Sequence, residues 1–269
     1  MIVVKVPIEN SNDYLGCRKA GNEIIKNFPN KYSSENRQEI IKGDLNLEEI
    51  HLDNANLNQA NKLIYENSAE IIEINEKIIF LGGDGSMCYS IGKAFMKVCN
   101  SEHKNPFLII FDAHADVEDY NKIPNNRQWL RALINDGFPS KNIILIGLRN
   151  SNNKENSFLD ENKIRVYRMH DLEEYQEVCD IIMELSRNNQ IYLSIDIDVI
   201  DSVFVPGTAN KESAGITTRQ LIYFLQRLNI LNNLRVIDIN EVNPDLDVNN
   251  QTVKFGAKIL GELLAKRLK

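Results

Sequence analysis

The sequence predicts an α/β protein in which a mainly parallel sheet lies between two layers of helices, a three-layer αβα sandwich. Short apolar runs rich in β-branched residues alternate with amphipathic stretches almost to the end of the chain. This alternation is typical of parallel sheets that are covered on both faces. No repeat, low-complexity linker or shift in composition marks a second unit. We therefore expect residues 1–269 to form a single domain.

Each expected strand is a short apolar run bounded by turn-forming or polar residues. In chain order, the expected strands are 2–7, 77–82, 107–113, 142–148, 163–167, 190–196 and 234–240. Between them, apolar residues recur at helical spacing near 20–27, 56–74, 86–98, 128–135, 172–187 and 217–228. A long final helix is expected from about 250 to 268. Gly82 and Gly83 are expected to serve a tight backbone turn, and Trp129 is expected to pack in the core.

Composition describes an ordinary globular protein and excludes several classes. The 269 residues are 43% hydrophobic and 26% charged, with a formal net charge of −7. A nucleic-acid surface is normally basic, so we expect no nucleic-acid partner. No apolar run approaches the length of a membrane span, and the N-terminus reads as a strand rather than a signal peptide. The four cysteines have no CxxC spacing, which indicates free thiols in a reducing cytoplasm.

Two acidic clusters carry the clearest chemical signal. Asp112, His114 and Asp116 stand at alternate positions directly after an apolar run, and so do Asp196 and Asp198. Side chains two residues apart in an extended chain share a face, so each group can converge. Four carboxylates around one point resist ionisation unless a cation lies between them. Mostly oxygen ligands with one nitrogen suit Mn²⁺ best, and Zn²⁺ or Fe²⁺ can also bind such a set.

Polar segments follow two further expected strands. Gly-Gly-Asp-Gly-Ser at 82–86 follows one of them, and Asn-Glu-Val-Asn-Pro at 240–244 follows the last. Sites in open α/β sheets form beyond the carboxyl ends of strands. We therefore expect all four segments to meet at one edge of the sheet.

These segments, in this order, resemble the ureohydrolase family, which includes arginases, agmatinases and formiminoglutamases. The family pattern reads GGDHS, DAHxD, SxDxDxxDPxxxPGTG and then an ENP-type segment on the last strand. The corresponding segments here are GGDGS at 82–86, DAHAD at 112–116, SIDIDVIDSVFVPGTA at 194–209 and NEVNP at 240–244. The resemblance implies an arginase-like fold and Mn²⁺-dependent hydrolysis of C–N bonds in a small cationic guanidino or amide substrate. It also implies a homo-oligomer, commonly a trimer or hexamer.

Carried over to this chain, the resemblance implies a binuclear manganese centre. Asp112 and Asp196 would bridge the two ions, His114 and Asp198 would complete the ligands of one, and Asp116 would serve the other. A bridging water with a lowered pKa would attack the guanidinium carbon.

The resemblance also implies two catalytic carboxylates. Asp116 would hold the attacking water and pass its proton to the departing amine. Glu241 would bind the guanidinium through two-point contacts, since a carboxylate matches that planar fork.

The chain departs from the family pattern at two chemically important positions. Gly85 replaces the histidine of GGDHS, which is the only nitrogen ligand of one metal, so one or two ions per chain are expected. Asn125 falls where the family places a proton-shuttling histidine, and asparagine can hydrogen-bond to substrate but cannot titrate. Glu118 stands at a loop position where the family carries substrate-contacting residues. Substitutes for the missing ligand remain open among the other histidines and one cysteine, namely His51, His103, His170 and Cys88.

Three functions remain open at this point. The first is an agmatinase- or arginase-like hydrolase with a degenerate second metal site. The second is a single-metal amidohydrolase that resembles histone deacetylases, and the third is a non-catalytic metal-binding member of the family. The segment 82–86 alone also resembles the nucleotide-binding loop of NAD and diacylglycerol kinases. A kinase would leave the other three segments unexplained.

Overall fold

The computed structural model describes residues 1–10 and 15–265. Its centre is an eight-stranded sheet in which all neighbouring strands run parallel. In order across the sheet, the strands are β4 (Leu47–Glu49), β1 (Ile2–Val6), β5 (Ile78–Gly82), β10 (Leu234–Asn240), β9 (Gln190–Asp196), β6 (Pro106–Phe111), β7 (Ile143–Leu148) and β8 (Arg165–Arg168). Two further strands, β2 (Lys31–Ser33) and β3 (Glu39–Ile41), pair as an antiparallel hairpin outside this sheet.

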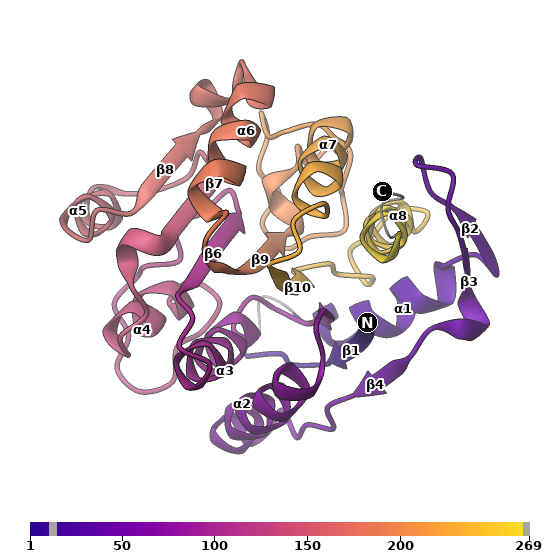
Figure 1. Ribbon diagram of the computed structural model, residues 1–269, viewed down its shortest axis with the longest axis horizontal. Helices are drawn as coiled ribbons and strands as arrows, with labels where there is room; N and C mark the ends of the chain where they lie inside the picture. Colours follow the sequence, from indigo (N-terminus) through magenta and orange to yellow (C-terminus); the bar gives the residue numbers. More distant parts are fainter. Residues whose placement is uncertain (11–14, 266–269) are drawn as a thin grey trace.

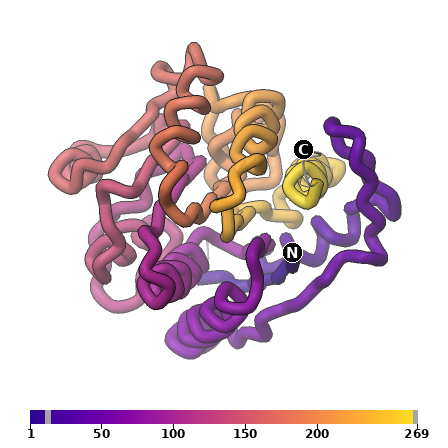
Figure 2. The backbone as a smooth tube through the Cα atoms, in the orientation of Figure 1, coloured from indigo at the N-terminus to yellow at the C-terminus, as the bar shows by residue number. Residues whose placement is uncertain are grey.

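Helices cover both faces of the sheet and confirm the three-layer αβα architecture (Figure 1). One layer contains α2 (Leu57–Ile74), α3 (Met87–Ser101) and α4 (Trp129–Asn135). The other contains α1 (Ala20–Asn27), α6 (Tyr175–Ser186), α7 (Thr218–Leu228) and α8 (Gln251–Leu264). Figure 2 shows the C-terminal helix α8 beside the N-terminal part of the chain, where it packs against α1.

Strand alternation divides the hydrophobic core into two clusters. Ile78 and Phe80 of β5 pack with α2 and α3, whereas Ile79 and Leu81 pack with the helices of the opposite layer. Successive side chains of a strand point to opposite faces, so a strand buried on both sides becomes a continuous apolar run. This burial explains why the sheet was predictable from short apolar runs.

The expected elements are confirmed with small shifts at their ends. The bounds of α1, β9 and β10 match the expectation, whereas β8 begins two residues later than expected and α6 begins at Tyr175. The end of the expected final helix, 266–268, lies outside the described residues.

Four elements were not expected: β2, β3, β4 and α5 (Asn153–Glu161). Each of the strands has three residues, two of which are exposed. Helix α5 buries a single side chain, Leu159, and begins with a capping box between Asn152 and Glu155. None of these elements carries the apolar periodicity on which the prediction depended.

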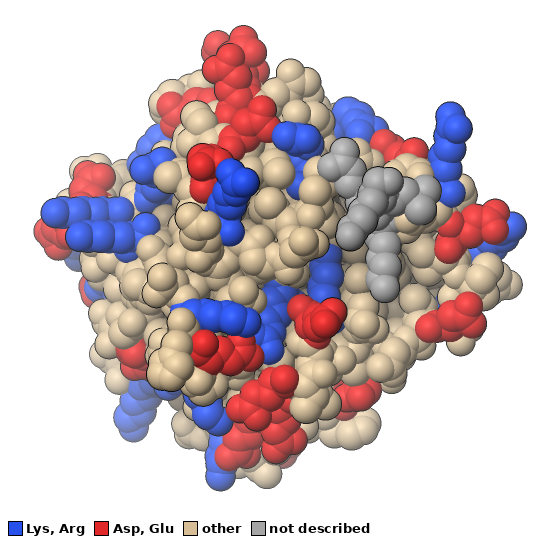
Figure 3. All heavy atoms as spheres, viewed as in Figure 1, with Lys and Arg blue, Asp and Glu red and all other residues tan. Residues whose placement is uncertain are grey.

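The four cysteines are buried thiols without a disulfide partner. Within the described part of the chain, no helix is long and apolar enough to cross a bilayer. Positive and negative side chains are interspersed over the face drawn in Figure 3. A cytoplasmic location and the absence of nucleic-acid partners stay predictions.

Candidate metal centre

Strand register brings the two acidic clusters to one edge of the sheet. Phe111 pairs with Ile195, so Asp112 follows β6 directly opposite Asp196, the last residue of β9. On the other side of β9, Asn240 pairs with Asp196. Residues that share a row across parallel strands direct their side chains to the same face. Asp112, Asp196 and Asn240 therefore form one polar row at the carboxyl ends of three neighbouring strands.

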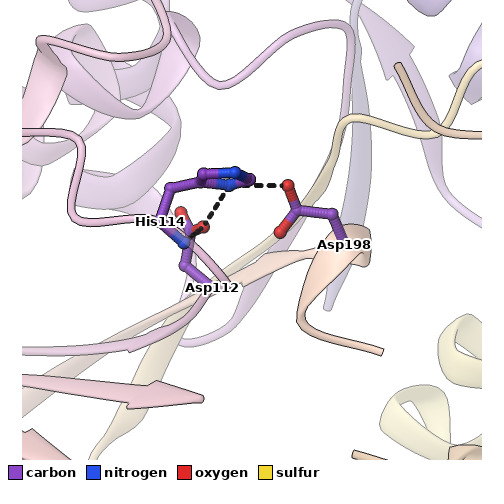
Figure 4. Close-up of side chains that lie close together, drawn as sticks. All are labelled: Asp112, His114 and Asp198. Carbon is purple, nitrogen blue, oxygen red and sulfur yellow. Dashed lines mark hydrogen bonds and ion pairs between the residues drawn. The ribbon is translucent and has the colours of Figure 1, made fainter. Parts of the chain in front are cut away.

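The most compact part of the site is formed by Asp112, His114 and Asp198. One ligand atom from each lies within 4.8 Å of the others. His114 Nδ1 is 2.9 Å from Asp198 Oδ2 and 3.5 Å from Asp112 Oδ1. Figure 4 shows the imidazole facing both carboxylates, which come from the ends of two different strands. Two oxygens and one nitrogen at this spacing are a fitting donor set for a divalent transition-metal ion.

Burial gives the carboxylates of this region a strong preference for a cation. The pKa of Asp112 is raised to about 6 by burial and by the charge of Asp198. Burial and the neighbouring acids raise the pKa of Asp116, Asp196 and Glu241 well above the ordinary range. Each of these groups would be easier to ionise next to a positive charge.

The pKa of the His114 imidazole is also raised, but there the shift favours the charged form. Burial lowers its pKa, but hydrogen bonds to Asp112 and Asp198 outweigh that effect and raise the pKa to about 12. A metal ligand must be a neutral imidazole, so metal binding at this group displaces a proton.

The loop that carries Asp198 is fixed by a single arginine. Arg149 donates hydrogen bonds to the carbonyl oxygens of Asp198, Val199 and Ile200, at 2.7, 3.1 and 3.4 Å. It also donates to the carbonyl oxygens of Glu212 and Ser213. A planar guanidinium can serve several acceptors at fixed angles, which a lysine cannot reproduce. Arg149 therefore holds the Asp198 loop and a neighbouring loop in one arrangement.

We expect Arg149→Lys to lower stability by about 1–3 kcal/mol, because buried carbonyl oxygens lose their donors. For a chain of this size, that loss corresponds to a fall in Tm of about 2–4 °C per kcal/mol. Differential scanning calorimetry with and without Mn²⁺ is the measurement. Arg165→Lys, at an exposed position of β8, is the matched control and should leave Tm unchanged. Equal melting curves for the two variants would show that the hydrogen bonds of Arg149 do not stabilise the Asp198 loop.

Asp116 has the left-handed backbone conformation that non-glycine residues rarely adopt. Its φ is +53°, and its Oδ2 accepts a hydrogen bond of 2.7 Å from Trp129 Nε1. The side chain is buried. Strained backbone of this kind is often retained at functional sites. Trp129 packs in the core, as expected, and also orients this carboxylate.

Glu241 has a similar backbone conformation and is also buried, with φ of +59°. Its Oε1 accepts hydrogen bonds from the backbone N–H of Gly85 at 2.7 Å and from Asn126 Nδ2 at 3.3 Å. Its backbone N–H donates to the carbonyl oxygen of Gly83. The carboxylate is therefore pinned beside the turn that follows β5.

The family model for the Arginase family matches residues 1–265. The chain belongs to the arginase family. The arginase of Staphylococcus aureus strain COL is 26% identical over an alignment of 260 residues. The alignment covers 84% of this chain and 84% of that arginase. The guanidinobutyrase of Pseudomonas aeruginosa is 29% identical over 224 residues, which cover 80% of this chain and 68% of the relative.

Solved structures confirm the arginase fold. Formimidoylglutamase from Bacillus subtilis matches with a TM-score of 0.86 at 22% identity, covering 98% of this chain and 85% of that one. A putative agmatinase from Clostridium difficile matches with a TM-score of 0.83 at 24% identity, covering 97% and 94%. The family is typically metal-dependent, and the cluster of Asp112, His114 and Asp198 is consistent with that property.

The candidate substitutes for the missing histidine are exposed histidines and one buried cysteine. The side chains of His51 and His170 are 91% and 75% exposed, and His103 lies in an exposed turn after α3. Cys88 is buried, with its thiol next to Ser194 and Asp238. None of these contacts joins Cys88 to the two clusters of the candidate site.

Two of the three expected substrate-contacting residues, Asn125 and Glu118, lie in the loop before α4. Asn125 is half-buried, and its Oδ1 accepts a hydrogen bond from the backbone N–H of Arg127. Its neighbour Asn126 is the one that contacts Glu241. Glu118 is half-buried, and its backbone N–H donates to the carbonyl oxygen of Arg127. Substrate contacts by Asn125 and Glu118 stay predictions.

Several functional contacts were missed by the sequence reasoning. Asn126 contacts Glu241, Arg149 braces the Asp198 loop, and Glu212 Oε1 lies 3.5 Å from His114 Nε2. Arg149 and Glu212 lie outside the recognised segments, and no local pattern distinguishes them from other loop residues. Asn126 lies next to Asn125 in the loop before α4, but nothing in the sequence indicates its contact with Glu241.

Proposed function

We propose that the protein is a divalent-metal-dependent hydrolase of C–N bonds in small guanidino compounds, with agmatinase- or arginase-like chemistry. The observation that carries the proposal is the convergence of Asp112, His114 and Asp198 at the carboxyl ends of β6 and β9 in a chain of the arginase family. The names of its relatives, arginase and guanidinobutyrase, support a guanidino substrate.

The proposed metal is Mn²⁺, one or two ions per chain, and Zn²⁺ or Fe²⁺ would also fit the donor types. When bound, such ions supply a water of lowered pKa and stabilise negative charge on the reacting group. The proposed ligands are the residues of the two acidic clusters, Asp112, His114, Asp116, Asp196 and Asp198.

Two buried carboxylates would act on the substrate. Glu241 would bind the guanidinium, since Gly85 and Asn126 hold its Oε1 in place while a planar cation pairs with the carboxylate. Asp116 would accept the proton of the attacking water and return it to the departing amine. Trp129 positions Asp116 for that task through its Nε1–H. Asn125 and Glu118 would contact the substrate from the loop before α4.

Urea release from a panel of guanidino compounds, measured with saturating Mn²⁺, tests the proposal. We expect urea from at least one of arginine, agmatine and 4-guanidinobutyrate, and its loss after chelation. Glu241→Gln keeps an acceptor for the Gly85 N–H but removes the charge, so kcat/KM should fall about 10- to 100-fold. Glu184→Gln, whose side chain is 76% exposed, is the matched control. No turnover of any compound by the metal-loaded native chain would contradict the proposal.

A single-metal amidohydrolase is the second candidate function. The observation that favours it is Gly85, which contributes no side chain at the position of the family's histidine ligand. That function predicts deacetylation of acetyl-polyamines without urea release. Absence of turnover on every substrate would instead support a non-catalytic metal-binding protein. A trimeric or hexameric assembly and a cytoplasmic location are further proposals, which sedimentation and cell fractionation would test.

A further inference from the structure

Gly85, which has no side chain, lies next to two side-chain oxygens, one from Glu241 and one from Asn240. An ideal Cβ placed on Gly85 would lie 3.3 Å from Glu241 Oε1, 3.4 Å from Asn126 Cβ and 3.7 Å from Asn240 Oδ1. Glu241 Oε1 is already engaged by the backbone N–H of Gly85 and by Asn126. The other side-chain oxygen near Gly85 is Asn240 Oδ1.

Asn240 is 2% exposed, and its amide is firmly oriented. Its Nδ2 donates at 2.6 Å to Asp238 Oδ1, and more weakly to Ser194 Oγ and Cys88 Sγ. A carboxylate accepts hydrogen bonds from an amide nitrogen but not from an amide oxygen. The bond to Asp238 therefore orients Nδ2 of Asn240 toward Asp238. The oxygen is thereby left on the side of the amide away from Asp238.

Across residues 1–10 and 15–265, Asn240 Oδ1 has no hydrogen-bond partner. A buried carbonyl oxygen without a partner destabilises the folded state, and such atoms are rare in native proteins. The register places Asn240 directly beside Asp196, which is beside Asp112. The unpartnered oxygen thus belongs to the same row as two proposed metal ligands and lies near Gly85.

We propose that Asn240 Oδ1 is a ligand of a second divalent ion and replaces the nitrogen ligand that Gly85 cannot supply. This proposal rests on the metal centre of the proposed function. With Asp112, Asp116 and Asp196 as the other donors, the second position would be an all-oxygen site. Oxygen-only sites suit Mn²⁺ and Mg²⁺, whereas a site with an imidazole, such as that of His114, also suits Zn²⁺. The two positions of this chain would therefore differ in metal preference.

Calorimetric titration with Mn²⁺ tests the proposal on the full chain. The native protein should bind two ions. Asn240→Leu, which keeps the shape but removes the oxygen, should bind the second ion about 10- to 100-fold more weakly and leave the first unchanged. Asn188→Leu is the matched control, because it makes the same change at an exposed position outside the site. Two ions should still bind to that variant with unchanged affinity.

Crystals of the native chain grown with Mn²⁺ provide a second measurement that does not depend on a variant folding. The anomalous map should show an ion at a coordination distance of about 2.0–2.4 Å from Asn240 Oδ1. A single ion at His114, a water in contact with Asn240 Oδ1, or equal affinities in the native chain and Asn240→Leu would each overturn the proposal. Equal weakening in Asn188→Leu would overturn it as well, because the loss would then not depend on the oxygen of Asn240.

The outcomes separate this proposal from the proposed function. Two bound ions with Asn240 as a ligand, but no urea from any guanidino compound, would refute the function and leave the ligand assignment intact. Urea release by a chain that binds one ion would refute the ligand assignment and leave the hydrolase intact.

Discussion

Replacing Gly83 by alanine is expected to prevent the chain from folding. An ideal Cβ at this position would lie 1.8 Å from the carbonyl oxygen of Ile8 and 2.8 and 2.9 Å from its carbonyl carbon and nitrogen. These are backbone atoms, which cannot move aside as a flexible side chain could. The neighbouring hydrogen bonds, from Gly83 N–H to Val6 O and from Glu241 N–H to Gly83 O, hold the crossing segments together. Moving the two segments apart to relieve the clash would break these hydrogen bonds.

The expected result is that Gly83→Ala yields no cooperative thermal transition, since the cost exceeds the stability of about 5–15 kcal/mol of a typical domain. Circular dichroism during heating is the measurement. Gly43→Ala is the control, because a Cβ at Gly43 meets nothing within 4 Å. That variant should melt like the native chain. A Gly83→Ala protein with a native Tm would show that the two segments do not cross as closely as described.

The position of Gly83 links the fold to the site. Its carbonyl oxygen holds the backbone of Glu241, and two residues later the N–H of Gly85 holds the carboxylate of the same residue. The sequence indicated a tight turn here. It did not indicate that the turn hydrogen-bonds to Glu241, because that contact joins residues more than 150 positions apart.

The sequence predicted the parts of the site that lie on strands, and the reason is periodicity. Buried parallel strands are apolar runs, so Asp112 and Asp196 stand out as polar residues at their ends. Residues whose role depends on long-range contacts could not be found in this way. Arg149 serves the Asp198 loop from another strand end, and Asn240 differs from an ordinary buried amide through one unpartnered atom. Both roles depend on which segments meet, which a single sequence does not specify.

Asp198→Asn is expected to abolish metal binding at the compact cluster while leaving the fold intact. Asp198 Oδ2 lies 2.9 Å from His114 Nδ1, and its Oδ1 accepts a hydrogen bond of 3.1 Å from the backbone N–H of Ala113. An asparagine at this position retains an oxygen for Ala113 but loses the charge that a divalent ion needs. In the metal-free variant, relief of the repulsion with buried Asp112 offsets part of the lost ion pair with His114, so the variant is expected to fold.

The decisive comparison is the rise in Tm on adding Mn²⁺. At a concentration about 100 times Kd, a bound ligand stabilises the native state by about 2.7 kcal/mol, which for a chain of this size is roughly 5–10 °C. The native chain should show this rise, whereas Asp198→Asn should show a smaller one, from the second ion alone, and should release no urea. Asp180→Asn changes the same chemical group at a surface position, where the side chain is 63% exposed and pairs with Arg227. It should respond to Mn²⁺ as the native chain does. An undiminished rise in Asp198→Asn would place the ion elsewhere, because a carboxylate in contact with the metal cannot lose its charge without loss of affinity.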